Sequence, residues 1–548
     1  MKNIFSKFII LSLIMLSACN DDFMERFPLD KINDANFWKT TADLETYANQ
    51  FYPILSMKIS SFKSTERMDN DNMSDNQGPA SISSFIWNEY VVPSSGGGWE
   101  KSDWSDIRSC NYFLQRYSRV QGDIADIKKY AAEIRFFKSY YYHEKVKQFG
   151  DIPWLSHDLQ TNSKELMGPR DSRKLVMDSV VVDLNYAAAN LPETSSDGRL
   201  TKYAALALKA RACLFEGTFR KYHNLGDHEK MLREAVNAAE AIINSGMFSL
   251  WSTGDTINDY YNLFIQSELA GNPEGIMIQR FIEDKKMHNR VREVGEAGSG
   301  FTKDFVETYL CKDGKPISVS TLYKGDTQFS DEFVDRDPRM QQTIYTQARP
   351  YHITETGEYQ YENVPQFDNG LCYTGYRIIK FFSPTQRDFE YERCILDDFI
   401  FRYGEVLLIY AEAKAELGEC AQEDLDKSVN LLRDRVGMPH LEVNVGFVDP
   451  NWPNWEVLVS PLINEIRRER RIELAAEGFR FDDLRRWKAG KLLDNDKTYL
   501  GARDPGTNDY RILYPGKTRA WNDKLYLYPL PLNELTLNPQ LGQNPGWE

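Results

Sequence analysis

Apolar residues recur at steps of three and four over long stretches of this chain, and that spacing constrains the fold more than any other feature. Between residues 124 and 149, for example, Ile127, Tyr130, Ile134 and Phe137 follow it. Such a repeat places apolar side chains on one face of a helix, which must then be buried against another element. The sequence therefore predicts a protein built mainly from amphipathic helices.

The same spacing, with glycine or proline at the ends, predicts further helices. The expected ranges are 103–116, 124–149, 171–191, 201–219, 228–245, 398–417, 422–436 and 462–477. The fourth helix is crowded with small residues, at Ala204, Ala205, Ala207, Ala210 and Ala212, so it should pack closely on its neighbours. Consecutive helix pairs of this kind predict an all-α fold with tetratricopeptide-like stacking.

Two regions break the helical pattern. Residues 57–100 are rich in Ser, Asn, Asp and Gly, and residues 251–395 mix short strand-like runs with turns. Long irregular segments in compact proteins are often functional. We expect one body over 19–548, with an N-terminal helical part at 19–250, an irregular lobe at 251–395, and C-terminal helices with a loop-rich tail at 396–548.

The N-terminus predicts export. Lys2 and Lys7 form a short positive region before an apolar stretch at residues 8–16. About ten apolar residues are too few to cross a bilayer, which needs about 20, but they suit a signal peptide over residues 1–18. The sequence Leu-Ser-Ala-Cys that ends at Cys19 resembles a bacterial lipobox, so Cys19 is the predicted lipidation site. The alternative is an ordinary signal peptide in which Cys19 is incidental.

Charge and the residues behind Cys19 narrow the location. Removing Lys2 and Lys7 with the signal peptide lowers the formal net charge from −15 to −17, which argues against a nucleic-acid partner. Asp21 and Asp22 resemble the surface-export signal of Bacteroidetes lipoproteins, the alternative being a polar tether. We expect a lipid-anchored protein of the outer membrane that is exposed at the cell surface.

Catalytic and metal motifs are weak, so we do not expect an enzyme or a cofactor. None of the seven histidines lies in an HExxH motif, and there is no GxSxG elbow. The sequence leaves open a pair of glycosidase carboxylates. The segment 69–75 is similar to a calcium loop but has Met73 and Ser74 at two key positions; a structural Ca²⁺ remains one possibility beside a solvated turn.

We interpret the cysteines and one cluster of charged residues as structural. Six cysteines follow Cys19, with Cys372 and Cys394 closest in sequence; buried free thiols are favoured for most of them over disulfides. The cluster at residues 465–473 predicts ion pairs along one helix, at spacings of three and four, rather than a polyanion site.

Several segments in order resemble the SusD/RagB family of Bacteroidetes surface lipoproteins. The strongest is Glu-Arg-Arg-Ile-Glu-Leu at 469–474, which continues to the run at 477–487. The other segments lie at 132–137, 149–153, 198–202, 313–317, 336–339, 405–413 and 543–547. The resemblance covers essentially the whole chain from Cys19 onward.

The resemblance implies an all-α fold with about four tetratricopeptide-like units and an irregular lobe. It also implies a partner, a SusC-like TonB-dependent transporter, and a ligand, usually an oligosaccharide held by aromatic and polar side chains. Three functions follow: a glycan-binding lipoprotein that delivers its ligand to the transporter, a peptide-capturing member of the same family, and a surface glycoside hydrolase, which is the least favoured.

The family's ligand surface tends to come from the early loops and from the lobe, which here are residues 65–100 and 284–301. The candidate ligand-binding residues are Asp69, Asp71, Asn72, Trp87, Tyr90, Trp99, His288, Arg290 and Phe301. Each has a structural alternative. Trp87 and Trp99 are more often core anchors of a loop than ligand platforms, and His288 is as readily a surface histidine as a ligand contact.

Overall fold

The computed structural model describes residues 34, 37–55, 70–195 and 198–548. The predicted signal peptide, the lipidation site Cys19 and the candidate ligand residue Asp69 lie outside these ranges. No helix in the described ranges is long and apolar enough to cross a membrane.

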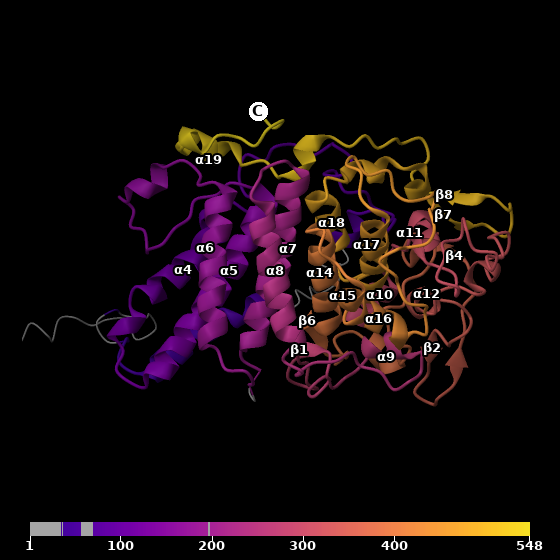
Figure 1. Ribbon diagram of the computed structural model, residues 1–548, viewed down its shortest axis with the longest axis horizontal. Helices are drawn as coiled ribbons and strands as arrows, with labels where there is room; N and C mark the ends of the chain where they lie inside the picture. Colours follow the sequence, from indigo (N-terminus) through magenta and orange to yellow (C-terminus); the bar gives the residue numbers. More distant parts are fainter. Residues whose placement is uncertain (1–33, 35–36, 56–69, 196–197) are drawn as a thin grey trace, which may run out of the picture.

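The N-terminal half is an array of helices that stand side by side (Figure 1). The helices are α2 (Thr41–Asn49), α4 (Ser105–Leu114), α5 (Ile124–Phe149), α6 (Arg173–Asn190), α7 (Lys202–Tyr222) and α8 (His228–Ile243). Along the chain, α5 packs on α6, α6 on α7 and α7 on α8. This stacking of neighbours confirms the predicted all-α fold, and the predicted limits of α5 agree with the structure.

Small residues bring α7 close to its neighbours. The five alanines that suggested close packing are all buried, with exposed fractions of 0–2%. Gly217 lies where a Cβ atom would come within 3.0 Å of the backbone nitrogen of Leu232 in α8. A larger residue at this position would therefore push the two helices apart.

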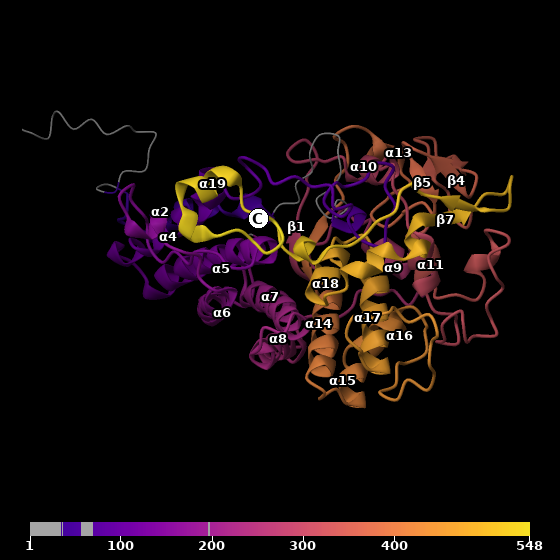
Figure 2. The same ribbon diagram turned by 90° about the horizontal axis from the view of Figure 1, so that it is seen from above.

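The irregular lobe carries short helices and paired strands around its own apolar core. Its elements are α9 (Asp259–Leu263), β1 (Gly275–Gln279), α10 (Arg290–Gly295), α11 (Lys303–Thr308), α12 (Arg339–Thr343), β2 (His352–Ile353), β3 (Tyr359–Gln360), β4 (Gln366–Asp368), β5 (Cys372–Gly375) and α13 (Gln386–Phe389). Figure 2 shows the lobe beside the helical array rather than above it. In the described ranges each sheet has two strands, so the lobe is held by side chains more than by strand pairing.

The C-terminal part returns to helices. It comprises β6 (Asp398–Arg402), α14 (Tyr403–Glu416), α15 (Gln422–Asp426), α16 (Val429–Arg435), α17 (Pro461–Glu473), α18 (Arg480–Arg486), β7 (Leu500–Arg503), β8 (Tyr510–Ile512) and α19 (Leu532–Leu537). α14 packs on α8 and α17, which joins this part to the array. The last residues run back over the N-terminal helices, where Arg170 donates to the Leu541 carbonyl at 2.7 Å (Figure 2).

Several predicted helix ends differ from the structure by one to four residues, as for α17, which was predicted to end at residue 477 and ends at Glu473. Two predicted helices were wrong in more than their ends. The segment predicted as a helix from residue 398 begins with β6, which pairs antiparallel with β1 and buries Phe399 and Phe401. The helix predicted at 422–436 is two helices, because the backbone leaves the helical region at Ser428, with φ −138° and ψ −94°. At this break the Ser428 side chain donates its hydroxyl to the Asp424 carbonyl.

The described part of the early loop is not a solvated turn. Asp71, Ser74, Asp75, Asn76 and Gln77 all have exposed fractions of 3% or less. The segment runs between the lobe and α18. Its backbone is hydrogen-bonded to the lobe, with the Thr302 N–H donating to the Asn76 carbonyl at 2.9 Å. The prediction of a solvated turn here was wrong, since Asp71 accepts backbone N–H groups of residues 478 and 480 and Asp75 pairs with the buried side chains of Arg471 and Arg480.

The six cysteines of the described ranges are unpaired, and five of them are buried.

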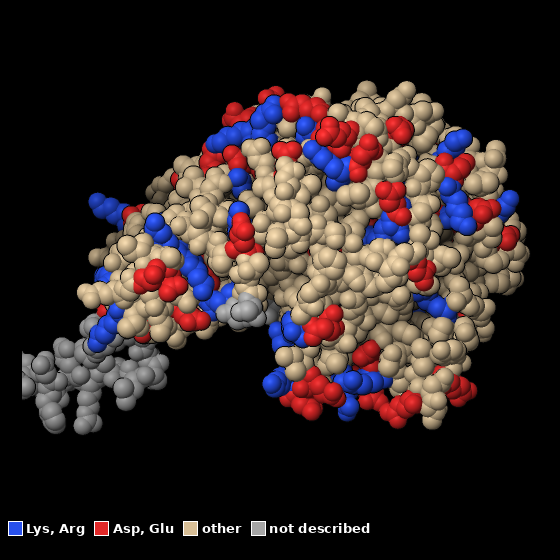
Figure 3. All heavy atoms as spheres, turned by 60° about the horizontal axis from the view of Figure 1, so that its bottom comes forward, with Lys and Arg blue, Asp and Glu red and all other residues tan. Residues whose placement is uncertain are grey.

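Surface charges show no segregation by sign on the face in Figure 3, where acidic and basic side chains alternate around a broad area of other residues.

The charged cluster of α17 forms ion pairs, as predicted. Most of these pairs do not follow the predicted spacing along the helix. One pair within the cluster, Arg468 with Glu465, follows the helical spacing. The other arginines and glutamates reach across to different elements, for example Arg470 to Asp483 at 2.9 Å. α17 is therefore held by ion pairs between elements rather than along its own surface.

Glu473 is the centre of this network. Its carboxylate contacts Arg339 of α12 at 3.1 Å, Arg402 of β6 at 3.0 Å and Arg435 of α16 at 2.6 Å. Burial opposes ionisation of Glu473, but the three arginines outweigh it and hold the pKa of the carboxyl well below its usual range. One side chain thus joins the lobe, β6 and α16.

Removing this charge should unfold the protein more easily. We expect Glu473→Gln to lower the free energy of unfolding by about 3–5 kcal/mol, because it leaves buried guanidinium groups without a counter-charge. The matched control is Glu419→Gln, which removes a carboxylate from an exposed pair with Arg233 and should leave the free energy of unfolding nearly unchanged. Urea unfolding measures both; equal shifts in the two variants would contradict the role given to Glu473.

Candidate functional site

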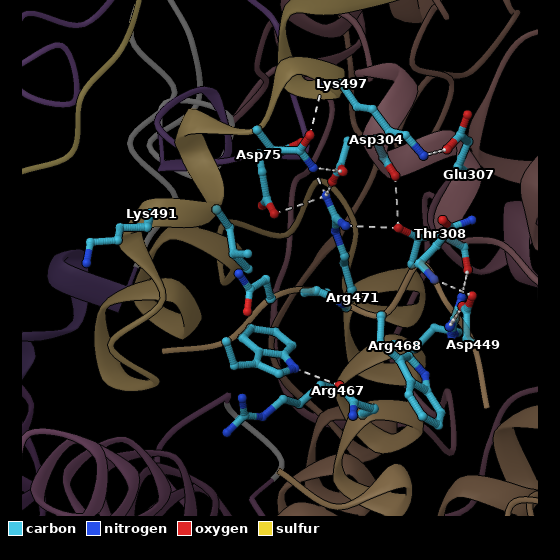
Figure 4. Close-up of a pocket in the computed structure, with 18 of the residues that line it drawn as sticks. Asp75, Asp304, Glu307, Thr308, Asp449, Arg467, Arg468, Arg471, Lys491 and Lys497 are labelled. Carbon is cyan, nitrogen blue, oxygen red and sulfur yellow. Dashed lines mark hydrogen bonds and ion pairs between the residues drawn. The ribbon is translucent and has the colours of Figure 1, made fainter. Parts of the chain in front are cut away.

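A cavity of about 590 Å³ opens between α17, α11 and two loops. Its walls come from α17, from α11, from the loop at residues 449–456 and from the segment at residues 491–497 (Figure 4). A volume of this size lies within the range of roughly 300–1,000 Å³ that is usual for small-ligand sites. We call it the tryptophan cavity, after Trp452 and Trp455 in its lining.

One face of α17 forms a polar wall of the cavity. Asn464, Arg467, Arg468 and Arg471 line it, at positions i, i+3, i+4 and i+7 of the helix. In most helices this spacing carries apolar residues toward a core. α17 begins where the Ser460 hydroxyl accepts the N–H of Ile463 at 3.2 Å, which fixes the start of the helix beside the loop.

Arg471 holds the deeper part of the wall. Figure 4 shows its guanidinium between Asp75, Asp304 and Thr308. It donates to the Asp304 carboxylate at 2.7 Å, to the Thr308 hydroxyl at 2.9 Å and to the side-chain oxygen of Asn76 at 2.7 Å. The early loop and α11 are thereby fixed to α17.

The two tryptophans are positioned by their indole N–H groups. Trp452 donates to Glu465 at 2.7 Å, and Trp455 donates to the side-chain oxygen of Asn464 at 2.6 Å. Both residues are half-buried. The Arg467 guanidinium lies 4.6 Å from the Trp455 ring centre, a cation–π contact that further fixes this ring.

This arrangement suits a ligand with both apolar faces and hydroxyl groups. The indole rings offer flat apolar surfaces whose own polar atoms are already bonded. Exposed side-chain amides of Asn451 and Asn454 line the cavity and can both donate and accept, whereas that of Asn495 is already bonded to Asp304 and to the Lys497 N–H. A sugar ring presents C–H faces and a rim of hydroxyls, so it matches both kinds of surface.

The structure places the predicted aromatic residues in the interior. Trp87 is 7% exposed and packs edge-on against Tyr514, and Trp99 is 4% exposed and packs against Phe149. Tyr90 is half-buried, with its ring 6.0 Å from that of Trp547. Burial favours the alternative role of Trp87 and Trp99 as anchors of the loop; ligand contact by these residues stays a prediction.

Asp71 and Asn72 also have partners within the protein. Asp71 is fully buried and accepts the backbone N–H of Gly478 at 3.1 Å. Burial raises the pKa of its carboxyl to about 7, and the backbone N–H donors limit the rise. Asn72 accepts a hydrogen bond from the Ser299 hydroxyl at 2.7 Å, which joins the early loop to the lobe.

His288, Arg290 and Phe301 are buried in the lobe, with exposed fractions of 0–2%. The alternative prediction of a surface position for His288 was therefore wrong. Phe301 stacks on Phe305 at 4.4 Å, and Arg290 pairs with Asp398 at 3.0 Å. The two segments predicted to share a ligand surface do lie against each other, since the Gly78 N–H donates to the Gly300 carbonyl at 2.9 Å. Their role in ligand binding is still a prediction.

Sequence reasoning missed the residues of the tryptophan cavity. Asn451-Trp452-Pro453-Asn454-Trp455 stands between two predicted helices, and polar residues at helical spacing follow it on α17. Two tryptophans three residues apart in a loop with proline and asparagine were the available signal. Asp75 is the cavity residue that comes from the predicted early loop.

The structure holds no calcium ligand set in the ranges it describes, where no group of three or more His, Cys, Asp or Glu side chains could hold a metal ion. The predicted calcium loop includes Asp69, which is outside these ranges. Asp75 is bonded by Arg480 at 2.7 Å.

His288 should make the protein less stable in mild acid. Its Nδ1 lies 3.1 Å from the N–H of Arg290 and its Nε2 lies 2.9 Å from the Leu396 carbonyl, which fits a neutral ring protonated at Nε2. Burial, aided by the charge of Arg290, lowers the pKa of His288 to about 4. The unfolded imidazole binds a proton below about 6.5, so stability is lost as the pH falls from 6.5 toward 4, by about 3 kcal/mol in all.

The measurement is a pH titration of the histidine ring resonances by NMR, together with urea unfolding between pH 7 and 4.5. The His288 resonance should keep its neutral position at pH 5, and His288→Gln should have a weaker loss of stability with acid. A ring that titrates near pH 6.5 in the folded protein would contradict this assignment.

Comparisons with known proteins agree with the fold. The SusD-like protein P2 of Formosa agariphila is 26% identical over 556 residues, which cover 98% of this chain and 99% of that protein. A solved structure of a SusD-like protein from Bacteroides fragilis is 25% identical with a TM-score of 0.74, covering 95% of this chain and 100% of the other. A SusD-like carbohydrate binding protein from the same species is 22% identical with a TM-score of 0.70, covering 92% and 100%.

Two family models match the sequence. One, described as "Starch-binding associating with outer membrane", matches residues 27–214. The other, described as the SusD family, matches residues 251–547, more than half of the chain. The chain belongs to the SusD family.

Proposed function

We propose that the protein is a cell-surface lipoprotein that captures oligosaccharides in the tryptophan cavity and delivers them to a TonB-dependent outer-membrane transporter. The observation that carries the proposal is the pairing of two fixed, half-exposed indole rings with a wall of hydrogen-bonding groups. Rings in this state lose little side-chain freedom when a ligand stacks on them, because their geometry is already set.

The family supports the glycan as the ligand class. One structural relative is named a SusD-like carbohydrate binding protein, and one matching family model is described as starch-binding and associated with the outer membrane. Outer-membrane association suits the predicted lipid on Cys19, since the described helices offer no membrane span. In this proposal the lipid holds the protein beside a SusC-like transporter.

A peptide is the alternative ligand within the same family. Extended peptides are commonly bound by adding a strand to an open sheet edge. The described residues that line the tryptophan cavity come from helices, turns and loops, with none from a strand. The cavity therefore favours a saccharide, which needs ring faces and scattered hydrogen bonds rather than a backbone ladder.

Loss of either indole ring should weaken glycan binding. We expect Trp452→Ala and Trp455→Ala each to reduce the affinity for a bound oligosaccharide about tenfold or more, which corresponds to about 1.4 kcal/mol of stacking and desolvation. Isothermal titration with a panel of plant, algal and bacterial oligosaccharides measures the effect. The matched control is Trp154→Ala, another half-buried tryptophan, which packs on Tyr142 and does not line the cavity.

A peptide panel run in parallel separates the two ligand classes. Binding of peptides alone, lost in the same tryptophan variants, would replace the glycan by a peptide. Glycan affinity that is unchanged in both cavity variants would contradict the site.

One observation bears on a hydrolase. Asp75 and Asp304 are neighbours in the cavity wall, and their pKa values move apart: burial raises that of Asp304, whereas Arg471 and Arg480 lower that of Asp75 despite its burial. Opposite shifts are typical of an acid–base pair. However, both Asp304 oxygens already accept hydrogen bonds, from Arg471 at 2.7 Å and Asn495 at 2.9 Å. These bonds favour a role for Asp304 as a hydrogen-bond acceptor that fixes the cavity wall, rather than as a proton donor in catalysis.

We therefore expect no turnover. Purified protein incubated for a day with the oligosaccharide it binds should return that oligosaccharide unchanged in chain length by chromatography. Shorter products that form with the wild type and fail to form with Asp304→Asn would establish a hydrolase and overturn the binding-protein proposal.

A further inference from the structure

The charges in the wall of the tryptophan cavity balance. Among the described residues that line it, six are acidic and six are basic. The acidic residues are Asp75, Asp304, Glu307, Asp449, Glu456 and Asp494. The basic residues are Arg467, Arg468, Arg471, Arg480, Lys491 and Lys497. A protein with a formal net charge of −15 thus has a candidate site that is formally neutral.

Each of the six basic groups already has a carboxylate partner. The pairs are Arg480–Asp75 at 2.7 Å, Arg471–Asp304 at 2.7 Å, Arg468–Asp449 at 2.6 Å, Arg467–Glu416 at 3.1 Å, Lys491–Glu456 at 3.5 Å and Lys497–Glu307. Figure 4 shows several of these pairs in the wall of the cavity. The four arginines are therefore held in buried pairs, and the cations that a ligand could reach are Lys491 and Lys497, whose side chains are 61% and 40% exposed and lie beside carboxylates.

Among the described arginines that line the cavity, Arg467 has buried N–H groups without a hydrogen-bond partner, at Nε and Nη1. Both atoms are shielded from solvent, and the guanidinium lies 4.6 Å from the ring of Trp455 and 4.3 Å from that of Trp487. Because aromatic rings cover this group, an anion in the cavity cannot make the two-pronged contact by which arginine binds sulfate or carboxylate.

An anionic sugar would have to break an existing pair. A sulfate or uronate that took Arg468 would leave Asp449 buried without its counter-charge, and it would also face the remaining carboxylates at short range. Both effects oppose binding, and the second grows as water is excluded. A neutral sugar meets neither penalty, because its hydroxyls can donate to the paired carboxylates and accept from asparagine amides.

From this we infer that the tryptophan cavity selects uncharged oligosaccharides over sulfated or uronic-acid-containing ones. The inference rests on the proposed function, since it names the substrate class of that same site. The charge balance provides the selection, and the indole rings provide affinity without regard to charge.

The test compares matched ligands on the full-length protein. The first set holds neutral oligosaccharides from laminarin, starch, mannan and xylan, and the second holds anionic oligosaccharides from alginate, pectate and carrageenan. Any neutral ligand that binds is then compared with its own chemically sulfated derivative at low salt. We expect the sulfated form to bind about tenfold or more weakly than its neutral parent.

A charge variant sharpens the test. Glu307→Gln removes the partner of Lys497, whose side chain is 40% exposed, and gives the cavity one unpaired positive charge. The ratio of sulfated to neutral affinity should then rise roughly threefold at low salt, as expected for unit charges about 6 Å apart in water, and the rise should vanish near 0.5 M salt. Glu419→Gln makes the same change in net charge outside the cavity lining and should leave the ratio unchanged.

The outcomes separate the inference from the proposed function. Neutral binding that needs Trp455, with a weaker sulfated form, supports both. Anionic ligands that bind more tightly than neutral ones, and lose affinity in Trp455→Ala, overturn the inference and leave the glycan-binding site in place. Failure of every ligand in both sets to bind overturns the proposed function, and the inference with it.

Discussion

Buried ion pairs between α17 and the rest of the chain hold this structure together. Glu473 binds arginines from α12, β6 and α16, and Glu469 binds Arg339 at 2.5 Å and Arg433 at 2.9 Å. A charge buried without a partner is costly, so α17 is stable in its place only when the lobe and the C-terminal helices are folded around it. α17 also contributes to both apolar cores, with Ile466 in that of the helical array and Ile472 in that of the lobe.

The same helix links the fold to the site. Residues of α17 that face away from Glu473 line the tryptophan cavity, and Arg471 among them fixes the early loop and α11. Since the arginines are committed to carboxylates, the polar wall is rigid and nearly free of net charge. The many charged side chains in a site proposed for an uncharged ligand therefore have a structural role. They hold in place the tryptophan rings and amides that we expect to contact the sugar.

Much of the fold could be predicted from the sequence because apolar periodicity is local. The limits of α5 were correct, and the alanines of α7 correctly indicated close packing. Prediction failed where a distant partner decides the structure. Residues 398–402 are a strand because β1 lies beside them, Asp71 is buried because backbone groups near residue 478 bind it, and the α17 charges pair with residues that are far away in sequence. The prediction of the site residues failed for the same reason, since the neighbours that place Trp452 and Trp455 in a cavity are distant in the sequence.

The most direct test of this account is a crystal structure of the protein with a bound oligosaccharide identified by titration. We expect a sugar ring stacked on Trp452 or Trp455, hydroxyl groups bonded to the asparagines and carboxylates of the cavity, and every arginine pair of the α17 wall intact. A ligand bound elsewhere, for instance on the exposed Tyr359 and Tyr361 of the lobe with the tryptophan cavity empty, would contradict it.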